Sequence, residues 1–269
     1  MRPAISAIVI TKESAGRIGA CLESLRWADE IVVVDDFSAD GTPEFCRRFG
    51  AKVVPNRFVD FREQKSLAMS LAANDWVLEI DSDERVSDAM RESILRLAPG
   101  DFSRHAGFAF PRRTRFWGKW LRFGSMYPDW KERLYDRRRG AWSEGSVHER
   151  FVLRGPAKRL PGPILHEQDL DLAEYLARTT RYASLSAGDL FRRGKRASWH
   201  HYTVRPVYTF VYRYVIRLGI LDGIPGLVVS VMGAAGTFLK YLRLYELQRG
   251  YVPPDAKAAR AGEPGRVGP

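Results

Sequence analysis

The stretch Trp27–Thr42 reads WADEIVVVDDFSADGT, and its pattern predicts the fold class. The apolar run Ile31–Val34 has the length of a buried strand, and an acidic loop that contains glycine follows it directly. Similar short apolar runs lie at Ile5–Ile10, Lys52–Val54, Trp76–Ile80 and Gly107–Phe110. Helical patterns separate these runs, and strands that alternate with helices indicate an α/β fold with a mainly parallel sheet and helices on both faces.

The helices expected between these strands have recognisable ends. One is expected to be capped by Thr42 and to end at Gly50, because glycine tolerates the left-handed conformation found there. Two more are expected at Phe61–Ala72 and Ser87–Leu97, the second capped by Ser87 and stopped by the pair Pro99-Gly100.

The composition excludes several classes of protein. A chain of 269 residues can bury one large core, so we expect one α/β domain with an appendage. Cys21 and Cys46 are too few for a disulfide framework, and we expect both as reduced core thiols in a reducing compartment. The apolar N-terminal stretch is too short for a signal peptide. A net charge of +11 favours partners that carry phosphate or other anionic groups.

Acidic residues follow two of the expected strands. Asp35 and Asp36 come after one strand, and Asp81-Ser82-Asp83 comes after another. Ligands bind beyond the carboxyl ends of the strands in an open parallel sheet, so both clusters should lie at one site. Carboxylates two residues apart can hold a divalent cation that takes its other ligands from a bound diphosphate.

The tripeptide Asp-x-Asp also has a more ordinary explanation, since acidic residues fill loops and cap helices. It occurs a second time at Asp169-Leu-Asp171, where we expect a helix cap. The metal interpretation is favoured for Asp81 and Asp83 because an apolar strand precedes them and a second acidic loop should lie beside them.

Four ordered blocks of sequence resemble a known family. They are ISAIVITKE at Ile5–Glu13, WADEIVVVDDFSADGT at Trp27–Thr42, FREQKSLA at Phe61–Ala68 and DWVLEIDSDERV at Asp75–Val86. The chain resembles the family 2 glycosyltransferases over about residues 4–250, and most of all the branch of lipopolysaccharide core β-glucosyltransferases. The resemblance implies the GT-A fold, a nucleotide-sugar donor that is usually a UDP-sugar, and inversion at the anomeric carbon.

The resemblance also implies roles for single residues. Thr11 and Asp36 would contact the nucleoside, and Lys65 would face the base or the diphosphate. Asp83 would bind the metal, Mg2+ or Mn2+, while Asp81 would lie nearer the ribose. The expected donor side comprises Thr11, Asp35, Asp36, Lys65, Asp81, Ser82 and His148, and the expected metal ligands are Asp81, Asp83 and His166.

A Val-His-Glu block at residues 147–149 resembles the same branch. Inverting transfer needs a base that takes the proton of the acceptor hydroxyl, and a carboxylate opposite the leaving diphosphate suits that role. Glu149 is the candidate base, with Glu132 and Glu144 as alternatives in polar loops. His148 could steady the diphosphate or the metal, or simply satisfy a structural hydrogen bond, and His166 has the same two explanations. The expected catalytic residues are Glu149 and Asp83.

A helical, membrane-associated region is expected near the end of the chain. The apolar stretch Ile224–Leu239 would be about 24 Å long as a helix, shorter than the roughly 30 Å core of a bilayer, so a membrane span is not expected. Surrounding basic and aromatic residues favour an interfacial helix on an anionic membrane, at the cytoplasmic face of the cell membrane. The alternative is a helix that packs on the catalytic domain.

The expected organisation is a catalytic domain at residues 1–190, a helical membrane-associating region at 191–250 and a disordered tail at 251–269. The catalytic domain would divide into a nucleotide-sugar half at 1–110 and an acceptor half at 111–190. The expected function is transfer of a hexose, from UDP-glucose or a similar donor, to a lipopolysaccharide core or another envelope glycan or glycolipid. A polyprenyl-phosphate acceptor is an alternative.

The stretch Arg112–Trp120 leaves another alternative open, because it interleaves bases with aromatic residues as single-strand nucleic-acid binders do. The same pattern suits an acceptor that carries phosphate and sugar rings. We favour the acceptor and expect no nucleic-acid partner, because the acidic edge needed for a metal would repel a nucleic-acid backbone. A non-enzymatic, basic nucleic-acid- or membrane-binding protein is the remaining alternative.

Overall fold

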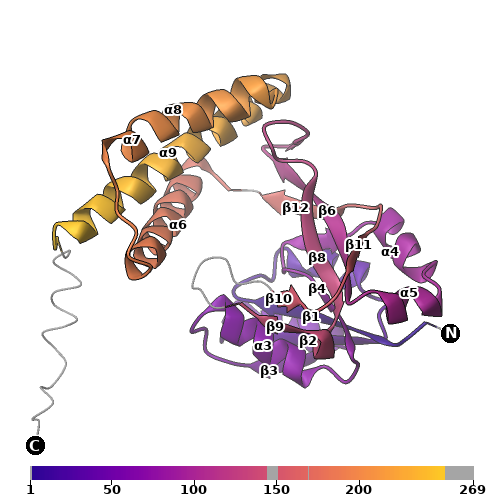
Figure 1. The fold of residues 1–269 in the computed structure, drawn as a ribbon. Coiled ribbons are helices and arrows are strands. Elements are labelled where there is room, and N and C mark those ends of the chain that lie inside the picture. The colour runs from indigo at the N-terminus through magenta and orange to yellow at the C-terminus, as the bar shows by residue number, and fades with distance from the viewer. Residues whose placement is uncertain (1, 144–150, 169, 252–269) are drawn as a thin grey trace, which may run out of the picture.

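The computed structural model describes residues 2–143, 151–168 and 170–251. An α/β unit contains the main sheet, and a helical unit that comprises α6 to α9 stands beside it (Figure 1). Within the described residues the main sheet has 10 strands, whose central path runs β3-β2-β1-β4-β8-β6-β12-β5. The predicted fold class, a mainly parallel α/β sheet with a C-terminal helical appendage, is confirmed.

The N-terminal half of the sheet is parallel, since β1 pairs with β2 and β4, and β2 pairs with β3. These strands are β1 (Ile5–Thr11), β2 (Glu30–Asp35), β3 (Lys52–Pro55) and β4 (Trp76–Glu79). The rest of the sheet comprises β5 (Glu84–Val86), β6 (Gly107–Phe116), β7 (Lys119–Trp120), β8 (Asp129–Asp136), β11 (Ala157–Arg159) and β12 (Ile164–Gln168). A separate two-stranded sheet pairs β9 (Gly140–Trp142) with β10 (Phe151–Leu153).

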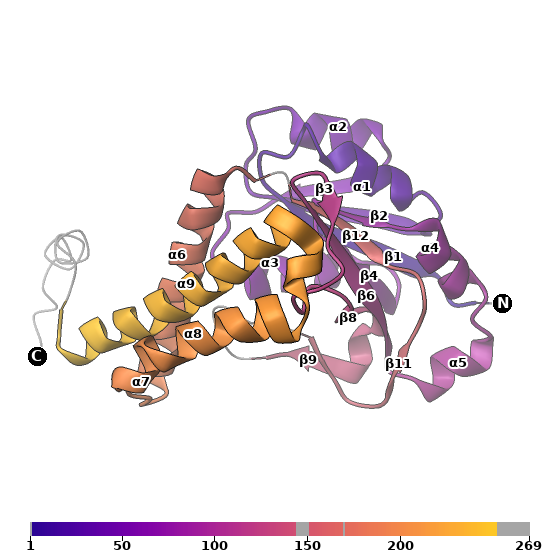
Figure 2. The same cartoon turned by 90° about the horizontal axis from the view of Figure 1, so that it is seen from above.

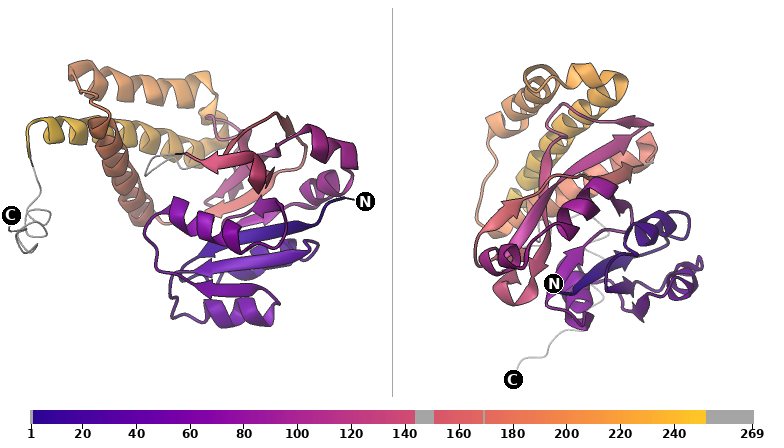
Figure 3. Two further views of the ribbon diagram at one scale, coloured as in Figure 1. Left: turned by 60° about the horizontal axis from the view of Figure 1, so that its bottom comes forward. Right: turned by 90° about the vertical axis from the view of Figure 1, so that its right-hand side faces the viewer.

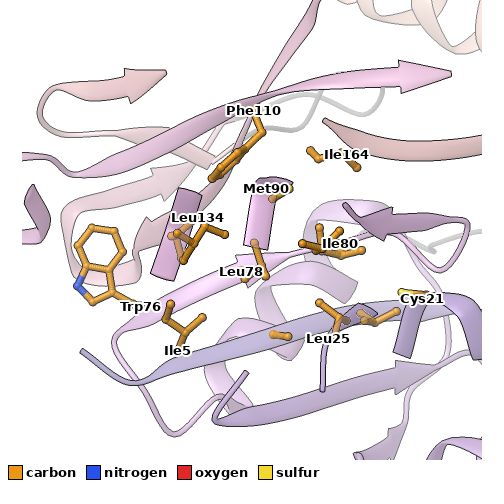
Figure 4. Packing of buried hydrophobic residues seen from close by; sticks show 14 of the residues in the cluster. Ile5, Cys21, Leu25, Trp76, Leu78, Ile80, Met90, Phe110, Leu134 and Ile164 are labelled. Atoms are coloured by element: carbon orange, nitrogen blue, oxygen red, sulfur yellow. The ribbon is translucent and has the colours of Figure 1, made fainter. Parts of the chain in front are cut away.

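Helices cover both faces of the sheet because successive strand residues point to opposite sides. Ala7 and Val33 join a core with α1 (Ile18–Ser24), α2 (Thr42–Arg48), α4 (Asp88–Leu95) and α5 (Pro99–Arg104). Figure 4 shows the centre of this core, and both cysteines are buried in it as free thiols. On the other face, Ile8 and Val32 pack with α3 (Phe61–Leu71).

Two predicted helix ends differ from the structure. Gly41, not Thr42, is the N-cap of α2, and it adopts a left-handed conformation. Thr42 is instead the first helical residue, and its hydroxyl bonds to Asp40 while accepting the N–H of Ser14. Pro99 does not simply stop α4, because it opens the short helix α5, where its missing N–H costs no hydrogen bond.

The helical unit begins with α6 (Leu172–Arg192), which Asp171 caps as predicted by accepting the N–H of Glu174. It continues through α7 (Trp199–Tyr202), α8 (Val204–Val211), η2 (Tyr212–Ile216), η3 (Gly219–Asp222) and α9 (Gly223–Gln248), while η1 (Arg137–Arg139) is a single turn after β8. Figures 2 and 3 show α6, α8 and α9 lying together. The expected division at residue 190 falls at the end of α6, but Ala187 of α6 packs with Leu244 of α9, so we propose that the helical unit begins at Leu172.

Helix α9 is longer than the sequence pattern predicted. It has 26 residues, which makes it about 39 Å long at 1.5 Å per residue. The segment Gly219–Gln248 is the one helical segment, among the residues described, that is long and apolar enough to cross a membrane, and 33% of its most apolar window is buried in the protein. The length argument against a membrane span is therefore wrong, although length and composition alone do not establish a span.

An arm formed by β6 and β7 joins the two units. Phe116 and Leu121 of this arm are buried against Val229 of α9. The Asp222 carboxylate also accepts hydrogen bonds from the backbone N–H groups of Arg122 and Phe123, at 3.0 and 2.9 Å. Phe116, one of the aromatic residues of Arg112–Trp120, thus docks the helical unit, a packing role that the sequence pattern did not reveal.

Candidate active site

A cleft of about 1690 Å3 lies between the carboxyl ends of the central strands and the helical unit. The sheet contributes Thr11, Asp36, Asp81 and Asp83 to its wall, among other residues. The opposite wall comes from α6, η2 and α9. The cleft is therefore the place where the acidic loops of the α/β unit face the helical appendage.

Thr11 and Asp36 lie at one end of this wall. Thr11 is only 6% exposed, and its hydroxyl has no hydrogen-bond partner among the described residues. Asp36 accepts a hydrogen bond of 2.6 Å from Lys12 and one of 3.0 Å from the N–H of Phe58, and these bonds hold the pKa of its carboxyl below the usual range. The buried hydroxyl of Thr11 is thus available to a ligand beside a carboxylate that stays ionised.

Asp35 and Ser82 occupy different positions. The Asp35 carboxylate is buried and accepts hydrogen bonds from the N–H and hydroxyl of Ser38, so it shapes the loop after β2. It does not belong to the cleft wall formed by the described residues. Ser82 does line the cleft, with its hydroxyl 3.4 Å from that of Ser14.

Asp83 and His166 form the part of the site best suited to a metal ion. Asp83 Oδ2 lies 3.3 Å from His166 Nε2, although the two residues are 83 positions apart in sequence. The other ring nitrogen, His166 Nδ1, lies 3.4 Å from the hydroxyl of Thr114, and such a second contact fixes the orientation of a ligating imidazole. Burial raises the pKa of Asp83, but the hydrogen bond and charge of His166 lower it more, so the carboxylate is ionised.

The donor set at this point is small. Within the described parts of the chain, no group of three or more histidine, cysteine, aspartate or glutamate residues is placed to hold a metal ion. Two protein ligands nevertheless fit a hard divalent cation that takes its other ligands from water and substrate phosphate. Asp83 and His166 thus suit such an ion, provided that a diphosphate completes its coordination.

Asp81 has other partners. Its Oδ2 atom lies 2.8 Å from Arg133 Nη2, and its Oδ1 atom lies 3.1 Å from Lys65 Nζ. Burial alone would raise the pKa of Asp81, but the charges of Arg133 and Lys65 hold it well below the usual range. The structure therefore pairs Asp81 with Lys65, both of which are expected on the donor side, and within the described residues it does not bring Asp81 into contact with His166.

Arg133 is the centre of a buried network of charges. Its guanidinium lies 2.6 Å from Glu79 Oε1 and 2.8 Å from Glu84 Oε2, in addition to its contact with Asp81. Glu79 also accepts hydrogen bonds from Lys65, at 2.6 Å, and from the hydroxyl of Tyr135, at 2.9 Å. Burial would raise the pKa of Glu79, yet the charges of Lys65 and Arg133 lower it. The network fixes the start and the end of the loop that carries Asp81 and Asp83.

A β-bulge places Arg133 in this network. Phe108 pairs with Leu134 and the next residue, Ala109, pairs with Glu132, so Arg133 is the extra residue of β8. Bulges of this kind re-aim side chains and often lie next to active sites. A single arginine before Leu134-Tyr135 is a weak sequence signal for such a role, because the sequence does not show where the bulge lies.

The candidates for the base divide into two groups. His148, Glu149 and Glu144 lie outside the described residues, so the structure gives no position for them. Glu132 was predicted in a polar loop, and this is wrong, because the residue lies on β8. Its exposed side chain lines the cleft.

Comparisons with known proteins agree with the sequence resemblance. Residues 6–159 match the family described as Glycosyl transferase family 2. A protein of Rickettsia typhi described as an uncharacterized glycosyltransferase is 28% identical over 264 residues, which cover 90% of this chain and 87% of the relative. The lipopolysaccharide core biosynthesis glycosyltransferase LpsC of Rhizobium meliloti is 28% identical over 250 residues, which cover 90% of this chain and 92% of LpsC.

Among solved structures, the mannosyltransferase PcManGT from Pyrobaculum calidifontis, in complex with GDP-Man and Mn2+, is similar with a TM-score of 0.49 and 15% sequence identity. The alignment covers 97% of this chain and 79% of PcManGT. The family match at residues 6–159 alone spans more than half of the 269 residues. The chain therefore belongs to glycosyl transferase family 2 and is a glycosyltransferase.

Proposed function

We propose that the protein transfers a hexose from a nucleotide-diphosphate donor, UDP-glucose or a similar sugar, to an envelope glycan or glycolipid, with inversion at the anomeric carbon. The observation that carries the proposal is the pairing of Asp83 with His166 in the same cleft as the unpartnered hydroxyl of Thr11. These groups match the two ends of a nucleoside diphosphate, a polar base and a charged diphosphate.

The nucleoside would lie at the carboxyl ends of β1 and β2. Thr11 offers a buried hydroxyl that can donate or accept a hydrogen bond, and Asp36 offers an ionised acceptor. Asp81, two residues before Asp83, and its partner Lys65 also line the cleft and would meet the ribose or the first phosphate. Ser82 would lie within the same donor side.

Asp83 and His166 would hold the divalent ion, Mg2+ or Mn2+, and the diphosphate would complete its coordination. When bound, such an ion neutralises the charge that develops on the departing diphosphate. Asp81 would stay with Arg133 and Lys65, so we propose that it orients the donor and does not bind the metal.

The acceptor hydroxyl would attack from the face of the sugar opposite the diphosphate. A carboxylate base there takes the hydroxyl proton as the new bond forms. Glu149 remains the proposed base on the strength of the family resemblance. Glu132 is the alternative, because it is a carboxylate that lines the cleft.

The acceptor class is inferred from a relative. LpsC is described as a lipopolysaccharide core biosynthesis enzyme, and it aligns with 90% of this chain. We therefore propose a lipopolysaccharide core or similar glycolipid acceptor, with a polyprenyl phosphate as the alternative.

We further propose that the helical unit attaches the enzyme to the cytoplasmic face of an anionic membrane. Large apolar side chains are exposed along its outer surface, including Val207, Val211, Val215, Ile216, Leu218, Ile220, Leu221 and Ile224. So many large apolar side chains exposed within one segment, residues 207–224, are unusual on a soluble protein and typical of membrane contact. Arg205 and Arg217 lie in the same segment and would meet anionic headgroups.

The experiment that tests the function is a hydrolysis screen, because many transferases slowly transfer a sugar to water when no acceptor is present. The full chain is incubated with a panel of UDP-, GDP- and dTDP-sugars, with Mg2+ or Mn2+ and with EDTA, and the free sugar is measured by mass spectrometry. We expect metal-dependent hydrolysis of one UDP-hexose. If none of the nucleotide sugars is hydrolysed when the metal is present, the proposal is contradicted.

A further inference from the structure

The wall of the cleft that belongs to the helical unit carries positive charges. Arg178 and Arg181 on α6, Arg213 on η2 and Lys240 on α9 all line the cleft, and we call these four residues the cationic wall. None of them lies within 4.0 Å of a carboxylate among the residues described in the structure. Arg178 donates a hydrogen bond to Gln168, and Lys240 lies over the ring of Tyr241, but neither contact supplies a negative charge.

The positions of these cations are built into the packing of the helices. Arg213 crosses α9 at Gly233, where a Cβ atom would lie only 2.6 Å from its guanidinium, so the missing side chain makes room for it. Burial and the neighbouring charge of Arg205 lower the pKa of Lys240, as expected where cations gather without acids. The Cζ atom of Arg178 lies 5.4 Å from the centroid of the Tyr175 ring. Burial raises the pKa of Tyr175, while the positive charges of Arg178 and Arg213 oppose that rise.

Cations that repel one another cost free energy unless an anionic ligand compensates them. Arg178, Arg213 and Lys240 are also half-buried, whereas Arg181 is exposed at the edge of the group. The proposed donor diphosphate would neutralise the cation at one end of the wall only. Arg178 donates a hydrogen bond to Gln168, whose Nε2 atom lies 3.4 Å from His166 Nε2, so Arg178 is close to the proposed metal pair. In the described part of the chain, Arg181, Arg213 and Lys240 make no hydrogen bond to the residues around the metal pair, and they line the cleft from the helical side.

From this arrangement we propose that Arg181, Arg213 and Lys240 form a subsite for a phosphate group of the acceptor. Arginine guanidinium groups bind phosphate in a fork, and a lysine adds a mobile point charge. This inference rests on the proposed transferase function, because it assigns the second substrate of the same cleft. The phosphate belongs either to a soluble phosphorylated saccharide or to a lipid-linked acceptor, and both present the same chemistry to the wall.

The test uses the full chain with UDP and Mg2+ at saturating concentrations, so that the donor side is filled. The soluble probe is sn-glycerol 3-phosphate, titrated by calorimetry. The lipid probe is a phosphatidylcholine vesicle with or without phosphatidic acid, and the protein that floats with the vesicles is measured.

The variant Arg213→Gln/Lys240→Gln removes two charges from the wall. Arg193→Gln/Lys195→Gln is a matched control, because both control residues are exposed on the same unit outside the cleft. The variant Arg181→Gln/Lys240→Gln leaves the packing at Gly233 intact, in case the first variant folds poorly.

We expect wild type and control to bind glycerol 3-phosphate equally, and each wall variant to bind it about tenfold more weakly, since two charge-assisted contacts are lost. Loss of this binding with vesicle binding retained indicates a soluble phosphorylated acceptor. Additional loss of the part of vesicle binding that depends on phosphatidic acid indicates a lipid-linked acceptor.

The inference is overturned if the wild type binds neither probe, or if the wall variants bind both as the wild type does. UDP affinity is measured in the same samples: if wild type fails to bind UDP, the proposed function fails, and if only the phosphate probes fail, this inference alone does.

Discussion

Arg133 Nη2 lies 2.8 Å from Asp81 Oδ2, so the first carboxylate of the Asp-x-Asp loop is engaged by the protein itself. The same guanidinium contacts the buried carboxylates of Glu79 and Glu84. The ion pairs of Arg133 thus fix both ends of the loop that carries Asp83, while Asp83 itself contacts His166.

Replacing Arg133 by methionine should strongly destabilise the protein, because three carboxylates would lose their shared cation in a buried site. The expected loss is about 3–5 kcal/mol in the free energy of unfolding, measured by urea denaturation. The matched control is Arg96→Met, whose side chain is 78% exposed and pairs with Glu92, itself 51% exposed, and which should change stability little. Equal effects of the two substitutions would show that the network contributes no more than a surface ion pair.

The network also predicts how stability depends on pH. The pKa values of Glu79 and Asp81 are lower in the folded protein than in the unfolded chain, so the unfolded state binds more protons in acid. Their contribution is complete above the unfolded pKa values of about 4 and declines as the pH falls below them. Urea midpoints measured from pH 7 to pH 3 should fall less steeply in Asp81→Asn than in wild type. If the urea midpoint of Asp81→Asn depends on pH as steeply as that of wild type, Asp81 does not contribute to the pH dependence of stability.

The base is tested by comparing two carboxylates. Glu149→Gln keeps the shape of the side chain and removes its basicity, so transfer should fall about 10²–10⁴-fold while the affinity for the donor nucleotide stays close to normal. Glu132→Gln should have a much smaller effect. The reverse result, with Glu132 essential and Glu149 dispensable, would move the role to the cleft-lining residue of β8.

Membrane attachment is tested at the apolar surface of η3 and α9. Ile220→Glu/Ile224→Glu places charges on two side chains that are 53% and 69% exposed, and it should abolish flotation with anionic vesicles at low salt. Leu95→Glu, on α4, is the control, because Leu95 is also exposed but lies in the α/β unit. If the double variant floats as well as wild type, the apolar surface does not contact lipid.

The local parts of this fold could be predicted from sequence. Strands at Ile31–Val34 and Trp76–Ile80 followed from short apolar runs, and the caps at Ser87 and Asp171 followed from side-chain chemistry. The acidic loops at the carboxyl ends of these strands followed from the geometry of parallel sheets.

The parts that depend on distant contacts could not be predicted in the same way. The role of Arg133 depends on a bulge in the pairing of β8 with β6, and no local pattern encodes that register. Phe116 and Trp117 resembled a stacking surface, yet Phe116 is buried against the helical unit, which begins more than 50 residues later in the chain. The gathering of Arg178, Arg213 and Lys240 likewise depends on how α6, η2 and α9 pack.

The central claim is that Asp83 and His166 hold the metal on which the donor diphosphate depends. The most direct measurement is calorimetric titration of UDP into wild type, Asp83→Asn, His166→Ala and Asp171→Asn, each with Mn2+ and with EDTA. Wild type and Asp171→Asn should bind UDP much more tightly with Mn2+ than with EDTA, whereas Asp83→Asn and His166→Ala should lose most of that difference. If both of these variants keep the full effect of Mn2+ on UDP binding, the metal does not lie between Asp83 and His166.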